Sequence, residues 1–254
     1  MLLRRLVRGA GFFGLTFGAG TLIIVAVERA KDTRDKVAAR DHWSGVWARG
    51  LLRLFAVDLV VTGDPGGNRH GQGRVVVANH RSIIDIAVVL SLFGGAMVSR
   101  KDLERWPIIG RAASGAGTIF VDRGSKESGA QAVQAMEASL RQHDTVCIFP
   151  EGTTFVDDEV RPFKAGGFVA AMRAGVPVVP VAIVYPSGSG AAFGGETFLR
   201  HLARLADTVR TRVFVEIGAP MTPAPDEPVV AFTERVRVEV DRLMATGRAR
   251  TDRR

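Results

Sequence analysis

A histidine and an aspartate stand five residues apart in segment 79–85, as His80 and Asp85. An imidazole can accept a proton from a hydroxyl near neutral pH, and a nearby carboxylate fixes its tautomer and stabilises the imidazolium that forms. No serine or cysteine nucleophile signature accompanies the pair. The spacing therefore indicates a general base that acts on the substrate's own hydroxyl.

The same segment also has a purely structural interpretation. Ser82 and Asp85 have the spacing of a capping box, in which the carboxylate accepts a hydrogen bond from a backbone N–H at the start of a helix. We expect that one carboxylate does not fill both roles well. Cap signatures precede many helices, so the segment alone leaves both interpretations open.

The pair lies where an apolar strand is expected to give way to a helix. Residues 74–78 have the composition of a short buried strand, and residues 82–93 have the apolar spacing of a helix. His80 is thus placed on the intervening turn. Open α/β sheets bind ligands at the carboxyl ends of their strands, so the turn is a candidate active site.

Three further segments place polar residues beside or just after an apolar strand. Residues 117–123 end in Arg123, and residues 149–154 carry Glu151 in a tight turn. Residues 176–183 form a strand marked by two prolines. Equivalent placement after strands of one parallel sheet predicts that these polar groups gather at one edge.

Together and in this order, the four segments resemble the glycerolipid acyltransferase family, which includes 1-acylglycerol-3-phosphate acyltransferases. The family pattern is NHxxxxD, GxxFxxR, FPEGTR or a close relative, and a VPxxPV strand, and the match extends over residues 75 to 185. Each block is short, but the ordered set is specific. The resemblance favours the catalytic interpretation of His80 and Asp85.

The resemblance implies a role for each motif residue. His80 is expected to take the proton of the acceptor hydroxyl while Asp85 orients it, so that the alkoxide attacks a thioester carbonyl without an acyl-enzyme. Arg123 is expected to hold the acceptor's anionic headgroup. The other expected acceptor-site residues are Glu151, Gly152, Thr153 and Lys164, with backbone N–H groups of the turn as candidate oxyanion donors. The structural alternatives are a solvated strand-end arginine for Arg123 and a capping turn carboxylate for Glu151.

One position departs from the family pattern. Where the commonest motif has arginine after Gly-Thr, this chain has Thr154, so a phosphate contact is missing unless Arg161 or Lys164 supplies it. Relatives that acylate other lysolipids, including lyso-ornithine lipid acyltransferases, are similar in having threonine there. The expected acceptor is 1-acylglycerol-3-phosphate, giving phosphatidic acid, and the alternative is another lysolipid such as lyso-ornithine lipid. A non-catalytic, membrane-bound lipid-binding scaffold is the alternative outside enzymes.

The N-terminal part favours membrane association. Residues 9–27 are uncharged, and a helix of that length spans roughly 28 Å, close to the hydrocarbon thickness of a bilayer. No convincing cleavage site follows this run, which argues against a cleaved signal peptide. Residues 42–57 have the pattern of an amphipathic interfacial helix, with Arg40, Arg49 and Arg53 available to anionic headgroups. Docking of its apolar face on the rest of the protein is a compatible alternative.

The remainder alternates apolar strands with helices, which predicts an α/β fold whose mixed, largely parallel sheet is flanked by helices. The expected parts are N-terminal membrane-associated helices (1–57), an acyltransferase catalytic domain (58–246) and a solvated basic tail (247–254). Expected strands cover 58–62, 74–78, 96–99, 118–121, 145–149, 178–184 and 212–217, and expected helices cover 82–93, 108–114, 126–142, 165–174 and 228–244.

Composition limits the partners. The net charge of +8 favours anionic partners, but a single tyrosine, the absence of Cys/His finger spacing and scattered basic residues argue against nucleic acid. The expected partners are membrane lipids, a lysophospholipid acceptor and an acyl-CoA or acyl-carrier-protein thioester as co-substrate, at the cytoplasmic face of the cell membrane. No bound cofactor or metal is expected. Cys147, the only cysteine, lies in an apolar run and is expected in the core.

Overall fold

The computed structural model of this protein describes residues 2–66 and 72–252. In this part of the chain the strands form a seven-stranded sheet in the order β1-β7-β6-β2-β5-β3-β4. All neighbouring strands are parallel except β6 and β7, which confirms the predicted mixed, largely parallel sheet. The strands are β1 Val57–Thr62, β2 Arg74–Ala78, β3 Ala96–Arg100, β4 Ile119–Val121, β5 Thr145–Ile148, β6 Val178–Val184 and β7 Thr211–Ile217.

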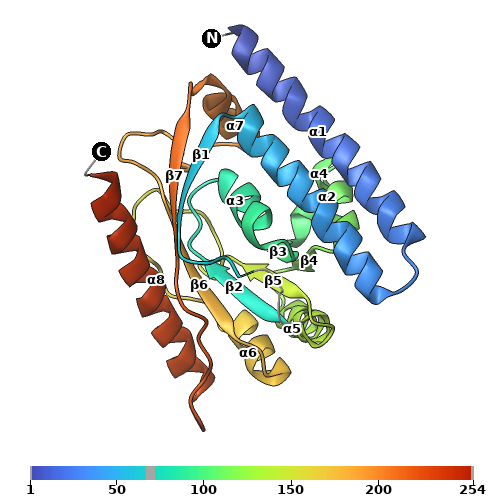
Figure 1. The fold of residues 1–254 in the computed structure, drawn as a ribbon, viewed down its shortest axis with the longest axis vertical. Coiled ribbons are helices and arrows are strands. Elements are labelled where there is room, and N and C mark those ends of the chain that lie inside the picture. Colours follow the sequence, from blue (N-terminus) through green and yellow to red (C-terminus); the bar gives the residue numbers. More distant parts are fainter. Residues whose placement is uncertain (1, 67–71, 253–254) are drawn as a thin grey trace.

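Helices cover both faces of this sheet (Figure 1). They are α1 Leu2–Arg29, α2 Thr33–Leu54, α3 Ile84–Phe93, α4 Ile109–Gly115, α5 Lys126–Arg141, α6 Gly166–Ala174, α7 Phe198–Asp207 and α8 Val229–Thr251, with a 3-10 helix, η1, at Lys101–Arg105. The sequence analysis missed α7 and η1. Leu202, Leu205 and Ala206 of α7 are buried at helical spacing, so the signal for this helix was present in the sequence.

The central strands are apolar on both sides because each side faces a separate core. Along β2, Val75 and Val77 pack in the core that also contains residues of α5, α6 and α8. Val76 and Ala78 pack in the opposite core, with residues of α2, α3 and α7. Figure 1 shows α8 on the far side of the sheet from α2 and α3.

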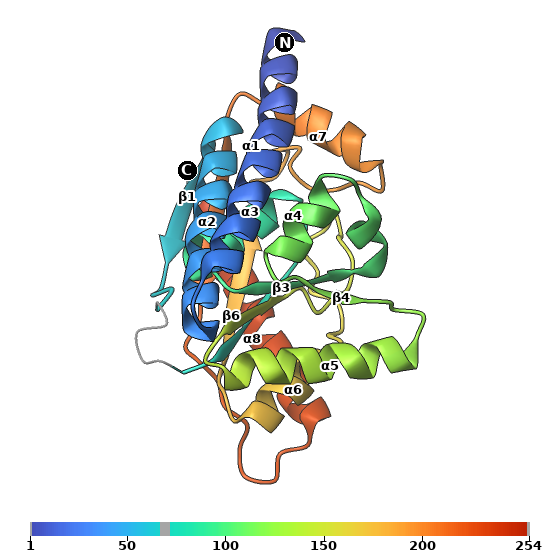
Figure 2. The ribbon, with the colours of Figure 1, turned by 90° about the vertical axis from the view of Figure 1, so that its right-hand side faces the viewer.

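The N-terminal helices pack on the domain. α1 lies beside α2 and contacts α4 and α7 (Figure 2). Leu51 of α2 and Phe55, directly after it, belong to the core, which confirms the docking alternative. Arg40 is also buried, and its guanidinium donates to Asp144 at 2.6 and 2.8 Å. The expectation that Arg40 is available to lipid headgroups is therefore wrong, whereas Arg49 and other exposed basic residues of α2 keep that possibility.

The expected basic tail is wrong for residues 247–251, which form the last turns of α8. The guanidinium of Arg248 donates to the carbonyl oxygen of Tyr185 at 2.8 Å, and that of Arg250 donates to Glu216 Oε1 at 2.8 Å. These contacts hold the end of the helix on the domain. Residues 253–254 of the expected tail, and residues 67–71 of the loop before β2, lie outside the described residues.

Candidate active site

The site is built where β2, β4 and β5 end at the same edge of the sheet. His80 follows β2 after Asn79, whose side-chain amide continues the pairing of β2 with β6. Asn79 Nδ2 donates to the carbonyl oxygen of Ile183 at 2.9 Å, and its Oδ1 accepts from the Ile183 N–H at 2.7 Å. Because the amide replaces a backbone pair, the chain can leave the sheet at a fixed point and turn His80 away from it.

His80 and Asp85 form the predicted pair. His80 Nδ1 lies 2.9 Å from Asp85 Oδ2, so Nε2 is the ring nitrogen left to accept a proton. The same Oδ2 accepts from the backbone N–H groups of Arg81 at 2.6 Å and Ser82 at 2.7 Å. The expectation that one carboxylate cannot serve both roles is wrong. The turn wraps around a fully buried carboxylate, which fixes the turn and the imidazole together.

Phe149 fixes the plane of the imidazole. The rings of His80 and Phe149 are stacked, with centroids 4.1 Å apart and an interplanar angle of 11°. The His80 side chain keeps 18% of its surface exposed, while the Asp85 side chain has none. The ring is therefore held from one edge and one face, and its remaining surface is open to a substrate.

Glu151 holds the backbone of the site. Its fully buried carboxylate accepts from the His80 N–H and from the Arg81 guanidinium, each at 2.8 Å, and from the Arg161 N–H at 3.1 Å. These partners occupy both oxygens, and Glu151 does not line the cavity beside His80. The expected contact of Glu151 with the acceptor does not fit this geometry. The structural alternative, a turn carboxylate that accepts hydrogen bonds from nearby backbone N–H groups, agrees with this geometry.

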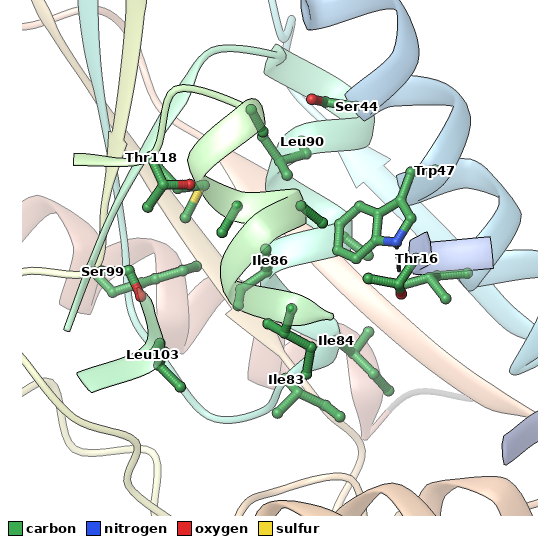
Figure 3. A pocket seen from close by; sticks show the side chains of 18 of the residues that line it. Thr16, Ser44, Trp47, Ile83, Ile84, Ile86, Leu90, Ser99, Leu103 and Thr118 are labelled. Carbon is green, nitrogen blue, oxygen red and sulfur yellow. Dashed lines mark hydrogen bonds between the residues drawn. The ribbon is translucent and has the colours of Figure 1, made fainter. Parts of the chain in front are cut away.

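An apolar cavity of about 470 Å³ runs beside His80, between α1, α2, α3 and α4. Figure 3 shows Ile83 and Ile84 at one end of the residues drawn, with Leu90 and Ser44 toward the other. The lining is mainly apolar, and the buried hydroxyl of Ser44 has no hydrogen-bond partner among the described residues. An apolar cavity of this size accommodates a hydrocarbon chain.

The structure brings most of the other predicted residues to the same cavity. Arg123, Gly152 and Thr153 line it, as does Thr154. Gly152 has a φ of +82°, a left-handed conformation that favours glycine, and a Cβ there would lie 2.9 Å from Lys164 Nζ. The ammonium of this exposed lysine is therefore close to the turn, although Lys164 itself does not line the cavity.

Arg123 also lines a second pocket, whose other charged residues are the cations Arg100, Lys101 and Arg105 and the carboxylates Asp102 and Asp122. Partial burial and the neighbouring Arg100 lower the pKa of the Arg123 guanidinium, which still stays protonated. Arg123 has no ion-pair partner within residues 2–66 and 72–252, so its charge is free to meet a ligand. Arg161, by contrast, pairs with carboxylates of its own loop, including Asp157 at 2.7 Å.

Comparison with known proteins agrees with this arrangement. Residues 64–184 match the family described as Acyltransferase. A protein named lyso-ornithine lipid O-acyltransferase, from Pseudomonas aeruginosa, is 31% identical over 225 residues, which cover 86% of this chain and 85% of that protein. The chain belongs to the acyltransferase family. This confirms the family that the four motifs predicted.

One further relative of this acyltransferase and one solved structure extend the comparison. The 1-acyl-sn-glycerol-3-phosphate acyltransferase of Neisseria meningitidis is 32% identical over 142 residues, which cover 56% of this chain and 55% of that protein. The crystal structure of the 1-acyl-sn-glycerophosphate acyltransferase PlsC from Thermotoga maritima has a TM-score of 0.74 at 21% identity. That similarity covers 96% of this chain and 95% of the other, and it confirms the fold.

The acyltransferase contains a second histidine cluster, which the sequence analysis missed because its members are far apart in the chain. Ser82 Oγ lies 3.3 Å from His201 Nε2, and His201 Nδ1 lies 3.0 Å from Glu196 Oε1. The order resembles a serine, histidine and acid triad. Ser82 and His201 are fully buried and do not line the cavity, so Ser82 Oγ cannot meet a substrate carbonyl. Burial is the main cause that lowers the pKa of His201, so the ring stays neutral at neutral pH.

The other groups that could bind metal or attack a substrate lie apart from the site. Within residues 2–66 and 72–252, no three His, Cys, Asp or Glu side chains are grouped to hold a metal ion. Cys147 is fully buried in β5, and burial raises the pKa of its thiol. Its predicted place in the core is confirmed. The expectation of chemistry without a bound metal or cofactor stays a prediction.

Proposed function

We propose that this acyltransferase moves a fatty acyl group from an acyl thioester to the free hydroxyl of a lysolipid, with His80 as the general base. One observation carries this proposal. The His80 imidazole, bound through Nδ1 to Asp85, lines an apolar cavity that Arg123 also lines. A proton acceptor, space for a hydrocarbon chain and a cation for a polar headgroup thus meet at one place.

In the proposed reaction, His80 Nε2 takes the proton from the acceptor hydroxyl as the oxygen attacks the thioester carbonyl. Asp85, at Nδ1, stabilises the imidazolium that forms. The tetrahedral intermediate then collapses, the carbon–sulfur bond breaks, and the imidazolium returns its proton to the leaving thiolate. The products are the ester and a free thiol.

The oxyanion of this intermediate needs N–H donors. The Gly152 N–H donates to the carbonyl oxygen of Phe149 at 3.1 Å and is not free. The backbone N–H groups of Thr153 and Thr154 have no partner among the described residues, and both residues line the cavity. We assign these two groups as the oxyanion donors, because unpaired N–H groups held by a rigid turn stabilise developing negative charge.

The acceptor headgroup is proposed to lie against Arg123 and the cations of the neighbouring pocket. Our first candidate is 1-acylglycerol-3-phosphate, which would give phosphatidic acid, because a phosphate pairs well with clustered guanidinium groups. The second candidate is lyso-ornithine lipid. It is favoured by Thr154 at the usual arginine position and by a relative of that name whose similarity covers most of both chains.

A competition assay separates the two acceptors. Purified protein would receive equal amounts of 1-acylglycerol-3-phosphate and lyso-ornithine lipid with one labelled donor. The first candidate predicts labelled phosphatidic acid as the main product, and mainly labelled ornithine lipid would select the second. Running the assay with acyl-CoA and with acyl carrier protein identifies the donor, because both present the same thioester carbonyl.

The test of the catalytic proposal is His80→Ala, with His42→Ala as the matched control. His42 is an exposed histidine on α2, so its removal should leave turnover unchanged. We expect His80→Ala to abolish measurable transfer while folding normally. Equal rates for His80→Ala and wild type would refute a general base at this position. A wild-type protein that binds lysolipid but transfers no acyl group would instead support the scaffold alternative.

We also propose that α1 lies in the membrane surface on the cytoplasmic side, where acyl thioesters are available. α1 is long and apolar enough to cross a bilayer. One face, however, packs on the domain through residues such as Phe12 and Ile23, while Leu3, Leu6 and Phe17 are 60 to 75% exposed. A helix docked on one side with apolar residues on the other fits an interfacial position.

Vesicle flotation tests this position. The double variant Leu6→Asp and Phe17→Asp should release the protein from vesicles, since charged residues on that face oppose burial among the acyl chains. Val238→Asp, on an exposed apolar residue of α8, is the matched control and should leave binding unchanged. Retained flotation of the double variant would contradict an interfacial α1.

A further inference from the structure

Tyr185, directly after β6, contacts Asp85 at the carboxylate oxygen that does not meet His80. Its hydroxyl donates to Asp85 Oδ1 at 2.5 Å, and its side chain is buried in the core. It does not line the cavity, so it has no direct access to substrate. It is also the only tyrosine of the chain.

The two oxygens of Asp85 have separate partners. Oδ2 accepts from His80 and from the N–H groups of Arg81 and Ser82. Tyr185 is the only donor to Oδ1 among the described residues. Because Asp85 is fully buried, water cannot replace that donor, and loss of the Tyr185 hydroxyl would leave a charged oxygen unpaired.

The surroundings keep the Tyr185 hydroxyl protonated and oriented. Burial, and then the charge of Asp85, raise the pKa of Tyr185 well above its ordinary value, so the phenol is a donor throughout the neutral range. Next to this contact, Ser82 Oγ lies within hydrogen-bond distance of His201 Nε2, and His201 Nδ1 lies within hydrogen-bond distance of Glu196 Oε1. The hydroxyl is thus part of a buried network that reaches from β6 to α7.

We propose that Tyr185 is a positioning residue for the catalytic pair, which holds the Asp85 carboxylate with Oδ2 toward His80 and sets how strongly that oxygen interacts with the imidazole. This rests on the proposed role of His80. By donating to Oδ1, the phenol draws negative charge away from Oδ2. A carboxylate that is less negative at Oδ2 stabilises the imidazolium of the proposed reaction less strongly.

Other ionisable groups also surround the pair, and the test must leave them unchanged. The Arg81 guanidinium donates to the His80 carbonyl oxygen at 2.9 Å, and Glu151 accepts from the His80 N–H. Arg123 shares the cavity with His80, and His201 lies behind Ser82. None of the contacts named for these four groups involves Tyr185, so its substitution removes none of them.

The first arm of the test is Tyr185→Phe. We expect kcat to fall about tenfold, since a hydrogen bond to a charged group is lost, with the KM for the acceptor unchanged. The acid limb of the pH profile of kcat should move to higher pH, because Asp85 then stabilises the imidazolium more strongly. The matched control is Thr233→Val, which removes one buried hydroxyl from α8 far from the site and should leave the profile unchanged.

The second arm uses the single tyrosine. Growth on 3-fluorotyrosine replaces Tyr185 alone, and its more acidic phenol is a stronger donor to Asp85. We expect the acid limb to move to lower pH, opposite to the effect of Tyr185→Phe. The fluorine NMR signal of this protein should also shift on Asp85→Asn, which reports the contact without any need for activity.

The outcomes separate this inference from the proposed function. The positioning role is overturned if the acid limb of the pH profile moves in neither arm, or if Asp85→Asn leaves the fluorine signal unchanged. Either result counts against it even if His80→Ala is inactive. An active His80→Ala would overturn the proposed function, whereas the fluorine signal would still report the contact. If Tyr185→Phe fails to fold, the fluorinated protein decides the question alone.

Discussion

Glu151→Gln separates a residue that holds the site together from one that binds the acceptor. In the structure, Glu151 Oε2 accepts from the His80 N–H and the Arg81 guanidinium, and Oε1 accepts from the Arg161 N–H. Glutamine has one oxygen and one NH₂ group, so it must turn a donor toward at least one of these donors. It also removes the charge that balances Arg81, whose side chain is only 3% exposed.

The expected cost follows from that burial. Breaking a buried ion pair by removing one partner costs about 3 to 5 kcal/mol of folding free energy, because the remaining charge is uncompensated. Urea unfolding followed by tryptophan fluorescence measures this cost as a lower midpoint. kcat should fall as well, because the His80 backbone loses a contact, while the KM for the acceptor stays within a few-fold of wild type.

The matched control is Glu159→Gln. Glu159 pairs with Arg161 at the surface, where its side chain is 68% exposed, so its neutralisation should cost less than about 1 kcal/mol. The reasoning fails if Glu151→Gln unfolds at the wild-type urea concentration and differs only in a raised KM for the acceptor. That result would restore the acceptor-binding role that the motif suggested.

Four further predictions follow from the geometry. Asp85→Asn should fold, because its amide oxygen can still accept from the turn N–H groups, but kcat should fall roughly 10³- to 10⁴-fold in steady-state assays, as for the acid of a catalytic triad. Arg123→Ala should raise the KM for the acceptor by the equivalent of about 2 to 3 kcal/mol, and an unchanged KM would contradict a headgroup contact. Leu90→Trp should fill part of the cavity and exclude about two methylenes of a long acyl chain. The lost burial of about 1.6 kcal/mol should lower kcat/KM for long-chain donors about tenfold relative to short-chain donors. Burial lowers the pKa of His201, so unfolding takes up a proton below about pH 6.5 and stability falls there with falling pH. Urea midpoints between pH 7 and pH 5 should therefore decrease more for wild type than for His201→Gln, and parallel curves would refute this.

Local patterns were sufficient for most of the fold. Short apolar runs and helical spacing predicted each strand, and the helices α3, α4, α5 and α6, to within a few residues, because the periodicity of a segment follows from the faces it buries. The prediction failed at α7, whose helical spacing was overlooked, and at residues 247–251. Basic side chains there indicated a solvated end, but Arg248 and Arg250 donate to acceptors on the segment after β6 and on β7, which are distant in the sequence.

The motifs were sufficient to predict which side chains lie together at the candidate site. The order of the motifs placed His80, Asp85 and Arg123 after strands of one parallel sheet, and such strands end at the same edge. Only the tertiary structure decided how each side chain is used. It lets Asp85 accept from both the turn and His80, and it directs Glu151 inward. It also brings Tyr185 to Asp85, and His201 to Ser82, from distant segments. The physical reason is that buried polar groups must find partners in three dimensions, and those partners come from segments with no fixed spacing in the chain.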